Sequence, residues 1–266
     1  MAYRTVGSGR PLVLITGFDG TQFEWDPGLI RALAIHHRVI LFDNRGAGLS
    51  TPANVNDLTV AEMASDTAAL IRALRIGRAD VLGWSMGGQI AQELTLRYPK
   101  MVRRLVLAST FPGGPTSPQT TNKHAIAVFA NPRPTVLELL STLFPADQSK
   151  AANAYVQRVL QQPDLTTHAF TVPPQTATEQ GKVVGPRTHC PGCGTYARLG
   201  RIHIPVLITF GVRDIVVPPP NSLLLHSRIH GSILMMFPDA GHAVMFQDFR
   251  RYAADVNHFL AAPRGR

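Results

Sequence analysis

The sequence has few cysteine, aromatic and charged residues, and each shortage excludes a class of protein. It contains 2 cysteines among 266 residues, which is too few for a disulfide-stapled scaffold and suits a reducing compartment. Aromatic residues make up 7%, and there is no run of five or more Lys or Arg, so the chain offers no platform for nucleic acid. Charged residues make up 16% against 45% hydrophobic residues, a balance that excludes a disordered chain.

Long hydrophobic runs and targeting signals are also missing. The apolar stretches are far shorter than the roughly 20 residues that a membrane-spanning helix requires, and the first ten residues do not lead from a charged start into an apolar segment. We therefore expect a soluble, cytoplasmic protein without a membrane span. The 26 basic and 17 acidic residues give a net charge of +9, but they are scattered, so we interpret the excess as solvated surface. The sequence leaves homo-oligomerisation open.

Short apolar runs alternate along the chain with amphipathic segments of helix length. The runs are continuous and end at turn residues, which is typical of strands buried on both faces of a sheet. Strands are predicted over residues 11–16, 38–42, 80–84, 105–108, 204–210 and 232–237. Helices are predicted over residues 60–74, 88–98, 219–229 and 243–260. This order predicts an α/β fold with a mostly parallel central sheet and helices on both faces.

The regular alternation stops over residues 111–198, which are rich in Pro, Thr, Gln and Ser. Only two helices are predicted there, over residues 135–143 and 150–160. The stretch is too long for one structureless loop between buried strands. We interpret it as a cap inserted over the carboxyl edge of the sheet, where open α/β folds bind ligands. The core would then comprise residues 1–110 and 199–266.

A candidate nucleophile lies between a predicted strand and a predicted helix. The segment from Gly83 to Gly87 reads G-x-S-x-G, with Ser85 at its centre. At such a sharp turn the flanking residues must be glycine, because a Cβ would collide with the neighbouring strand or helix. The helix N-terminus also favours negative charge beside the hydroxyl. This context predicts that Ser85 is a nucleophile.

A serine nucleophile needs a base, and the base needs an acidic partner. Among ten histidines, His242 is the one in a tight turn after the last apolar strand, at the same sheet edge as Ser85. Asp214 follows the strand at 204–210 and precedes His242 by 28 residues, whereas the end of the strand at 105–108 carries no carboxylate. The order Ser, Asp, His is the order expected with this elbow motif. These residues are the predicted catalytic triad.

A tetrahedral intermediate also needs two hydrogen-bond donors for its oxyanion. The backbone N–H of Met86, directly after the nucleophile, is the first candidate. The second is the N–H of Phe18, in the turn that follows the first long strand. Trp84 and Phe18 flank the predicted site and suggest an apolar wall. We place Gly17 and Trp84 in the expected substrate pocket.

With these motifs the chain resembles the α/β-hydrolase superfamily, in its capped α/β-hydrolase-1 type, over nearly all of residues 3–110 and 199–263. Residues 43–50 are similar to the family's structural D-x-R-G-x-G-x-S turn. Thr16 stands where the family's oxyanion turn usually has histidine, and the first family strand is expected to be largely missing, since ten residues precede the run that begins at Pro11. The resemblance implies a serine hydrolase, a carboxylesterase acting on a small-molecule ester, with no cofactor.

Other activities are compatible with the same three residues. A perhydrolase or cofactor-free haloperoxidase, a lactonase and a carbon–carbon bond hydrolase all use this triad, whereas epoxide hydrolases and haloalkane dehalogenases use a carboxylate where Ser85 stands. A ligand-binding receptor with an idle triad is the alternative outside the enzymes. Cys190 and Cys193 form a single C-x-x-C without the second pair typical of structural zinc. We therefore expect no metal and interpret this segment as a hinge between cap and core.

Overall fold

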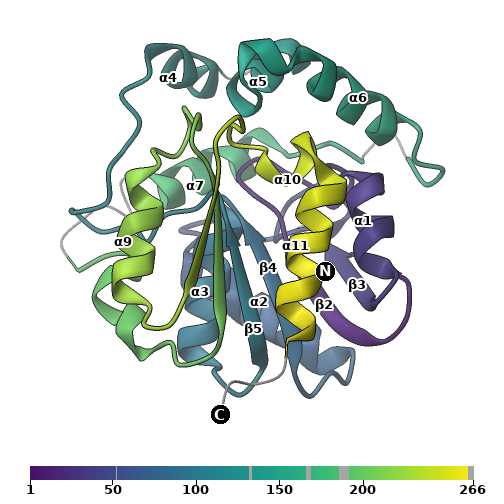
Figure 1. Ribbon diagram of the computed structural model, residues 1–266, viewed down its shortest axis with the longest axis vertical. Helices are drawn as coiled ribbons and strands as arrows, with labels where there is room; N and C mark the ends of the chain where they lie inside the picture. The colour runs from purple at the N-terminus through teal and green to yellow at the C-terminus, as the bar shows by residue number, and fades with distance from the viewer. Residues whose placement is uncertain (52, 132–133, 166–168, 186–191, 263–266) are drawn as a thin grey trace.

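Figure 1 shows the computed structural model of the protein, which describes residues 1–51, 53–131, 134–165, 169–185 and 192–262. Seven strands form one sheet in the order β1-β3-β2-β4-β5-β6-β7. The strands are β1 (Tyr3–Val6), β2 (Arg10–Ile15), β3 (His37–Phe42), β4 (Ala79–Trp84), β5 (Val102–Ala108), β6 (Val206–Gly211) and β7 (Ile233–Phe237). All neighbouring pairs are parallel except β1 and β3, so the predicted mostly parallel sheet is confirmed.

The first strand of the sheet is a short edge strand of four residues, and the expectation that the family's first strand is largely missing stays a prediction. Tyr3 pairs with Phe42 and Val6 pairs with Val39 in an antiparallel ladder at the edge of the sheet. A four-residue strand suffices there, because an edge strand needs only one neighbour and short edges expose few unpaired backbone groups.

Helices fill the connections between the strands. The α-helices are α1 (Pro27–Ala34), α2 (Val60–Ala73), α3 (Met86–Arg97), α4 (Lys123–Ala130), α5 (Val136–Leu143), α6 (Ser149–Leu160), α7 (Pro174–Val184), α9 (Pro220–Arg228), α10 (Val244–Gln247) and α11 (Phe249–Ala261). The short 3-10 helices are η1 (Gly48–Ser50), η2 (Ala146–Gln148) and η3 (Tyr196–Arg201). The single helix predicted over residues 243–260 is divided into α10 and α11. Asp248 separates them, and its side chain accepts the N–H of Arg251 at 3.2 Å, which makes it the N-cap of α11.

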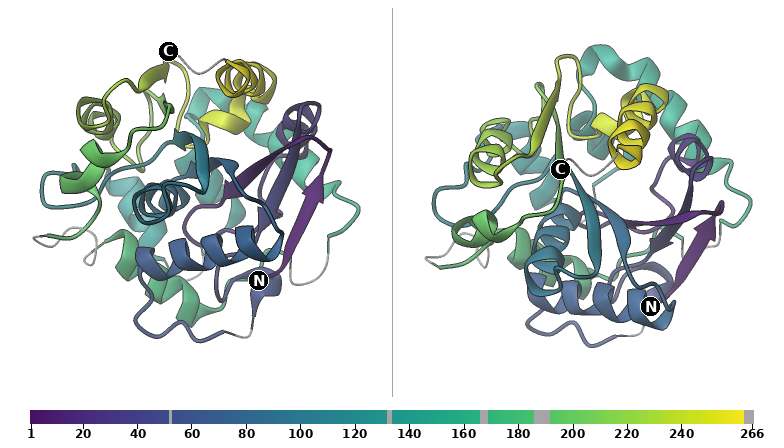
Figure 2. Two further views of the ribbon diagram at one scale, coloured as in Figure 1. Left: turned by 90° about the horizontal axis from the view of Figure 1, so that it is seen from below. Right: turned by 60° about the horizontal axis from the view of Figure 1, so that its bottom comes forward.

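The sheet separates two apolar layers. Along β2, Leu12 and Leu14 are buried on one face, and Val13 and Ile15 are buried on the other. The first face packs against α1 and α11, and the second packs against α2, α3 and α9. Figure 2 shows these helices on the two sides of the strands. Because both faces are covered, the strands read as continuous apolar runs rather than as alternating ones.

Residues 111–198, which the sequence predicts to be a cap and which we call the cap segment, contain α4, α5, α6 and α7. In Figure 1 the helices α4, α5 and α6 form a row across the top of the molecule, above the ends of the strands. The end of α5 lies against the carboxyl edge of the sheet, because the carbonyl oxygen of Leu143 accepts the N–H of Ala243 at 3.0 Å. The predicted helices at 135–143 and 150–160 correspond to α5 and α6, whereas α4 and α7 were not predicted.

Candidate active site

Ser85 lies at a strained turn between β4 and α3. Its φ of 55° and ψ of −122° are backbone angles that a non-glycine residue rarely adopts. A Cβ on Gly87 would overlap the carbonyl oxygen of Ile15, and a Cβ on Gly83 would overlap the backbone of Gly87. The two glycines that the sequence motif requires therefore allow α3 to pass close to β2. Ser85 is 9% exposed, so the turn leaves a small part of the residue open to solvent.

His242 and Asp214 form a buried pair on adjacent loops, after β7 and β6 respectively. The Nδ1 atom of His242 lies 2.8 Å from Oδ2 of Asp214. Asp214 is held by two further hydrogen bonds, because its Oδ1 accepts the N–H groups of Val216 at 2.8 Å and Val217 at 2.9 Å. A carboxylate can only accept, so Nδ1 of the neutral imidazole carries the hydrogen and Nε2 carries the free lone pair. His242 is 3% exposed, which protects the pair from competition by water.

The indole of Trp84 ties the serine turn to the histidine loop. Its Nε1–H donates to the carbonyl oxygen of His242 at 3.1 Å, and its ring lies 5.6 Å from the imidazole ring. On its other sides the indole packs on Trp25 at 6.2 Å and Phe246 at 5.2 Å. Trp84 is 6% exposed. Its contacts position the loop of His242, and a role as a wall of the substrate pocket stays a prediction.

The turn that contains Gly17 and Phe18 lies beside Ser85. A Cβ on Gly17 would lie 3.2 Å from Cβ of Ser85 and 3.6 Å from the carbonyl oxygen of Trp84. Met86 is the first residue of α3, so its N–H is one of the groups that a helix leaves without a partner in its own backbone. The predicted donors Phe18 and Met86 thus come from two segments that meet at Ser85.

The side chain of Phe18 contacts the cap segment. Its ring lies 6.1 Å from the ring of Phe129 on α4, in an edge-to-face arrangement. The next residue, Asp19, has a φ of 54° and donates its N–H to Oε1 of Gln180 on α7 at 2.9 Å. This hydrogen bond joins residues 161 positions apart, and nothing in the local sequence around either residue predicts it.

The turn at residues 43–50 supports the loop that follows Phe18. Oδ1 of the buried Asp43 accepts the N–H of Gln22 at 2.8 Å, and its Oδ2 accepts the N–H of Leu49 at 2.9 Å. The hydroxyl of Ser50 donates to the carbonyl oxygen of Asp43 at 2.8 Å. These bonds give the D-x-R-G-x-G-x-S segment the structural role that the resemblance implies.

Two carboxyl groups in this loop are less acidic than usual. Burial raises the pKa of Asp19 to about 6. Burial also raises the pKa of Glu24 to about 8, helped by the charge of Asp19 and opposed by a hydrogen bond from the N–H of Thr21. Both shifts favour the neutral form of these carboxyl groups, and burial is the main cause of each.

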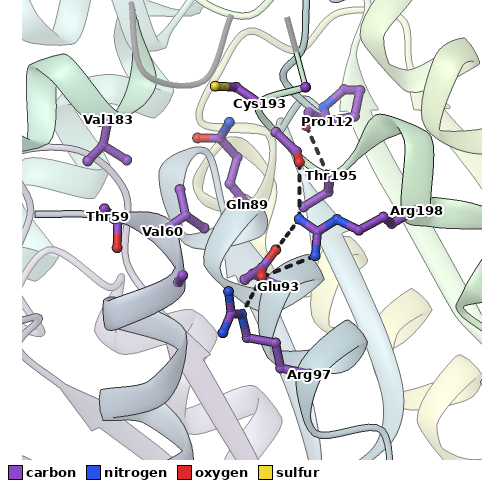
Figure 3. A pocket seen from close by; sticks show the side chains of 13 residues that line it. Thr59, Val60, Gln89, Glu93, Arg97, Pro112, Val183, Cys193, Thr195 and Arg198 are labelled. Carbon is purple, nitrogen blue, oxygen red and sulfur yellow. Dashed lines mark hydrogen bonds and ion pairs between the residues drawn. The ribbon is translucent and has the colours of Figure 1, made fainter. Parts of the chain in front are cut away.

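A separate hollow of 240 Å³ lies along α3, away from this loop cluster (Figure 3). Glu93 is at its centre and pairs with Arg97 at 2.5 Å and with Arg198 at 2.7 Å. Cys193 also borders it and is disulfide-bonded. Cys190 lies outside the described residues. Within the described part of the chain, no group of three His, Cys, Asp or Glu side chains is placed to hold a metal ion.

Comparison with known proteins assigns the family. A family model described as the alpha/beta hydrolase fold matches residues 10–249. The chain belongs to this family. The resemblance inferred from the motifs is thereby confirmed, as is the α/β hydrolase fold. None of the helices that the structure describes has the length and apolarity needed to cross a membrane.

Individual relatives of this α/β hydrolase span almost its whole length. The chain is 30% identical to a Mycobacterium tuberculosis protein with the provisional name non-heme bromoperoxidase BpoC, over 93% of this chain and 92% of the relative. It is 28% identical to a Variovorax paradoxus protein with the provisional name carbamate hydrolase RutD, over 95% of this chain and 92% of the relative. Among solved structures, an alpha/beta hydrolase fold protein from Chitinophaga pinensis superposes with a TM-score of 0.80 at 26% identity, covering 98% of this chain and 94% of the other.

Proposed function

We propose that this α/β hydrolase is a serine esterase that cleaves carboxylic esters through Ser85, His242 and Asp214. The observation that carries the proposal is the buried 2.8 Å pair of His242 and Asp214, in a loop tied to the strained turn of Ser85. A histidine paired with a carboxylate activates a serine hydroxyl for attack when its free ring nitrogen reaches that hydroxyl.

In the first half of the proposed reaction, Nε2 of His242 removes the proton of Ser85 while Oγ attacks the ester carbonyl. Asp214 accepts the Nδ1–H and stabilises the imidazolium that forms. The N–H groups of Phe18 and Met86 hold the oxyanion, and the α3 N-terminus adds a favourable dipole. The carbon–oxygen bond then breaks, and the alcohol leaves with the proton that His242 returns.

In the second half, water replaces the alcohol. His242 takes a proton from the water as its oxygen attacks the acyl-enzyme carbonyl, and the same proton returns to Oγ of Ser85 when the acid departs. The hydroxyl, the imidazole and the carboxylate are restored, so the cycle needs no further reactant.

The experiment that tests this proposal is labelling with a fluorophosphonate probe, together with turnover of short p-nitrophenyl esters. We expect the adduct on Ser85 by mass spectrometry, and we expect the Ser85→Ala variant to lose at least about a thousandfold in kcat. Its melting temperature should stay close to that of the wild type, since a small hydroxyl is removed. Ser227→Ala is the matched control, because this exposed hydroxyl donates within α9, to the carbonyl oxygen of Leu224.

Two results would contradict the proposal. A folded protein that takes no label and turns over no ester would favour a receptor on the same fold. Retained turnover in Ser85→Ala would remove this residue from the chemistry.

A second candidate is perhydrolysis, favoured by the 30% identity to the protein named as a bromoperoxidase. Hydrogen peroxide would attack the same acyl-enzyme in place of water, releasing a peracid. Measuring peracid and free acid together from one ester separates the two activities, and Ser85→Ala should abolish both.

A further inference from the structure

The buried amide of Gln180 bonds to the turn that contains the proposed oxyanion donor. Gln180 lies on α7 and is completely buried. Its Oε1 accepts the N–H of Asp19 at 2.9 Å, one residue after the proposed oxyanion donor Phe18. Asp19 has a φ of 54°, a strained angle for a residue with a side chain, so the turn needs a partner that holds it in this conformation.

The cap segment keeps Gln180 in place. Near the start of α7, the hydroxyl of Thr176 donates to the carbonyl oxygen of Gly46 at 3.0 Å. One residue after Gln180, a Cβ on Gly181 would lie 3.8 Å from the ring of Phe18. The helix is therefore fixed against the core on both sides of Gln180, which leaves its amide little freedom.

The chemistry of this contact decides which end of the amide faces Asp19. An N–H group donates, so the atom that faces it must be the carbonyl oxygen, and the amide nitrogen must point elsewhere. Nε2 is buried and has no acceptor among the residues that the structure describes. A buried donor without a partner is unfavourable, and it lies on the same amide that holds the oxyanion turn.

We infer that Nε2 of Gln180 donates to an acceptor oxygen of the substrate, close to the scissile carbonyl. The inference rests on the proposed function, because the carbonyl must first be seated at Phe18 and Met86. The substrate class is then an ester whose acyl part carries an ether, hydroxyl or carbonyl oxygen, rather than a plain alkyl ester. Gln180 is a specificity-determining residue in this role and a positioning residue for the turn.

Two p-nitrophenyl esters test the inference, the butyrate and the methoxyacetate, whose acyl chains have the same length and differ by one methylene replaced by oxygen. Intrinsic reactivity cancels when the ratio of their kcat/KM values is compared between wild type and variant. Gln180→Met keeps the length of the side chain and removes the donor and the acceptor. We expect it to lower kcat for both esters, and to lower the methoxyacetate-to-butyrate ratio by about fivefold, the size of one neutral hydrogen bond.

Gln175→Met is the matched control, since this exposed glutamine on the same helix bonds to Asn56 at the surface. It should leave the ratio unchanged. Gln180→Asn gives a second variant that keeps an amide but withdraws it by one methylene, and it should lower the ratio as Gln180→Met does.

An equal loss on both esters, with a lowered melting temperature, would mean that Gln180 only supports the fold, and the inference would be wrong. An unchanged ratio in either folded variant would also overturn it. Failure of the proposed function is recognised separately, because the wild type would then neither take the fluorophosphonate label nor turn over either ester, and the inference would fall with it.

Discussion

A buried ion pair fastens the cap segment to the core, and breaking it should destabilise the protein measurably. Arg158 on α6 reaches Asp26, with Nη2 2.6 Å from Oδ2 and Nε 3.0 Å from each carboxylate oxygen. The Asp26 side chain is completely buried and also caps α1 by accepting the N–H of Gly28 at 2.6 Å. Arg158→Met keeps the apolar stem of the side chain and removes the charge.

The expected loss in the free energy of unfolding follows from the Asp26 carboxylate, which is left without its cationic partner. Removing one partner of a buried pair strands the other charge without compensation, and typically costs about 3–5 kcal/mol. Asp26 keeps its hydrogen bond from the N–H of Gly28, and the Arg158 side chain is 24% exposed. We therefore expect a loss at the lower end of this range, about 3 kcal/mol. For a chain of this size the melting temperature should fall by about 6–9 °C, at roughly 2–3 °C per kcal/mol.

Urea and thermal unfolding of four proteins measure this loss: the wild type, Arg158→Met, Asp26→Asn and the double variant. The double variant should lose about 1–2 kcal/mol less than the sum of the single losses, because the stranded charge is gone. Arg250→Met is the control. The guanidinium groups of Arg250 and Arg158 lie 5.0 Å and 4.8 Å from the ring of Phe249, and that of Arg250 is exposed. The control substitution therefore removes a similar ring contact without breaking a buried ion pair. Losses from Arg158→Met no larger than those from Arg250→Met, or strictly additive losses in the cycle, would refute the reasoning.

Two more predictions concern the loops around the site. Burial raises the pKa of Glu24 to about 8 from its ordinary value near 4.5, so the carboxyl is neutral in both states below pH 4.5 and ionises first in the unfolded chain as the pH rises. The contribution of Glu24 to the free energy of unfolding therefore falls between about pH 4.5 and 8. The melting temperature of Glu24→Gln minus that of the wild type should grow over this range. A constant difference would show that Glu24 titrates normally. Trp84→Phe removes the indole donor of the 3.1 Å bond to His242 and should lower kcat several-fold with little change in KM. Trp25→Phe is its control, because the Nε1 atom of this buried indole has no partner in the described part of the chain, and equal kcat values in the two variants would argue against the positioning role of Trp84.

The fold and the residues around Ser85 were predictable because their signals are local. The G-x-S-x-G segment, the continuous strands and the ends of the strands carrying Asp214 and His242 each lie within a few residues of chain. Parallel topology brings the carboxyl ends of neighbouring strands to one edge, so three local signals imply one site. Asp248 was a local signal too, and treating it as a helix interior residue rather than an N-cap joined α10 to α11 in the prediction.

The helices of the cap segment were less predictable because distant contacts hold them. The buried residues of α7 include the polar Thr176, Glu179 and Gln180 beside a single buried valine, Val183, so its sequence lacks an apolar stripe. Its buried polar groups instead form hydrogen bonds to distant parts of the chain, such as the bond from the hydroxyl of Thr176 to the carbonyl oxygen of Gly46, 130 positions away. α4 and α5 both have eight residues, which is too short for periodicity alone to separate a helix from a strand. Thr135 and Glu138 form a capping box at the start of α5, and α4 offers no such pair. The hydrogen bond between Gln180 and the N–H of Asp19 cannot be predicted from the hydrophobic pattern or from the composition of either segment.

Besides the turn with Ser85 and Met86, three loops carry candidate catalytic groups, and the cap segment is joined to each of them at the residue next to that group. Gln180 bonds to Asp19 beside Phe18, Leu143 accepts from Ala243 beside His242, and Asp147 pairs with Arg213 beside Asp214 at 2.7 Å. The third contact contributes little, because Asp147 and Arg213 are 62% and 40% exposed and surface pairs are worth roughly 0–1 kcal/mol. The other two end at buried backbone groups, which must find new partners if the cap moves. In the proposed esterase, substrate selection by the cap segment and alignment of the oxyanion and histidine loops would therefore depend on the same hydrogen bonds, and a change in one of these properties would change the other.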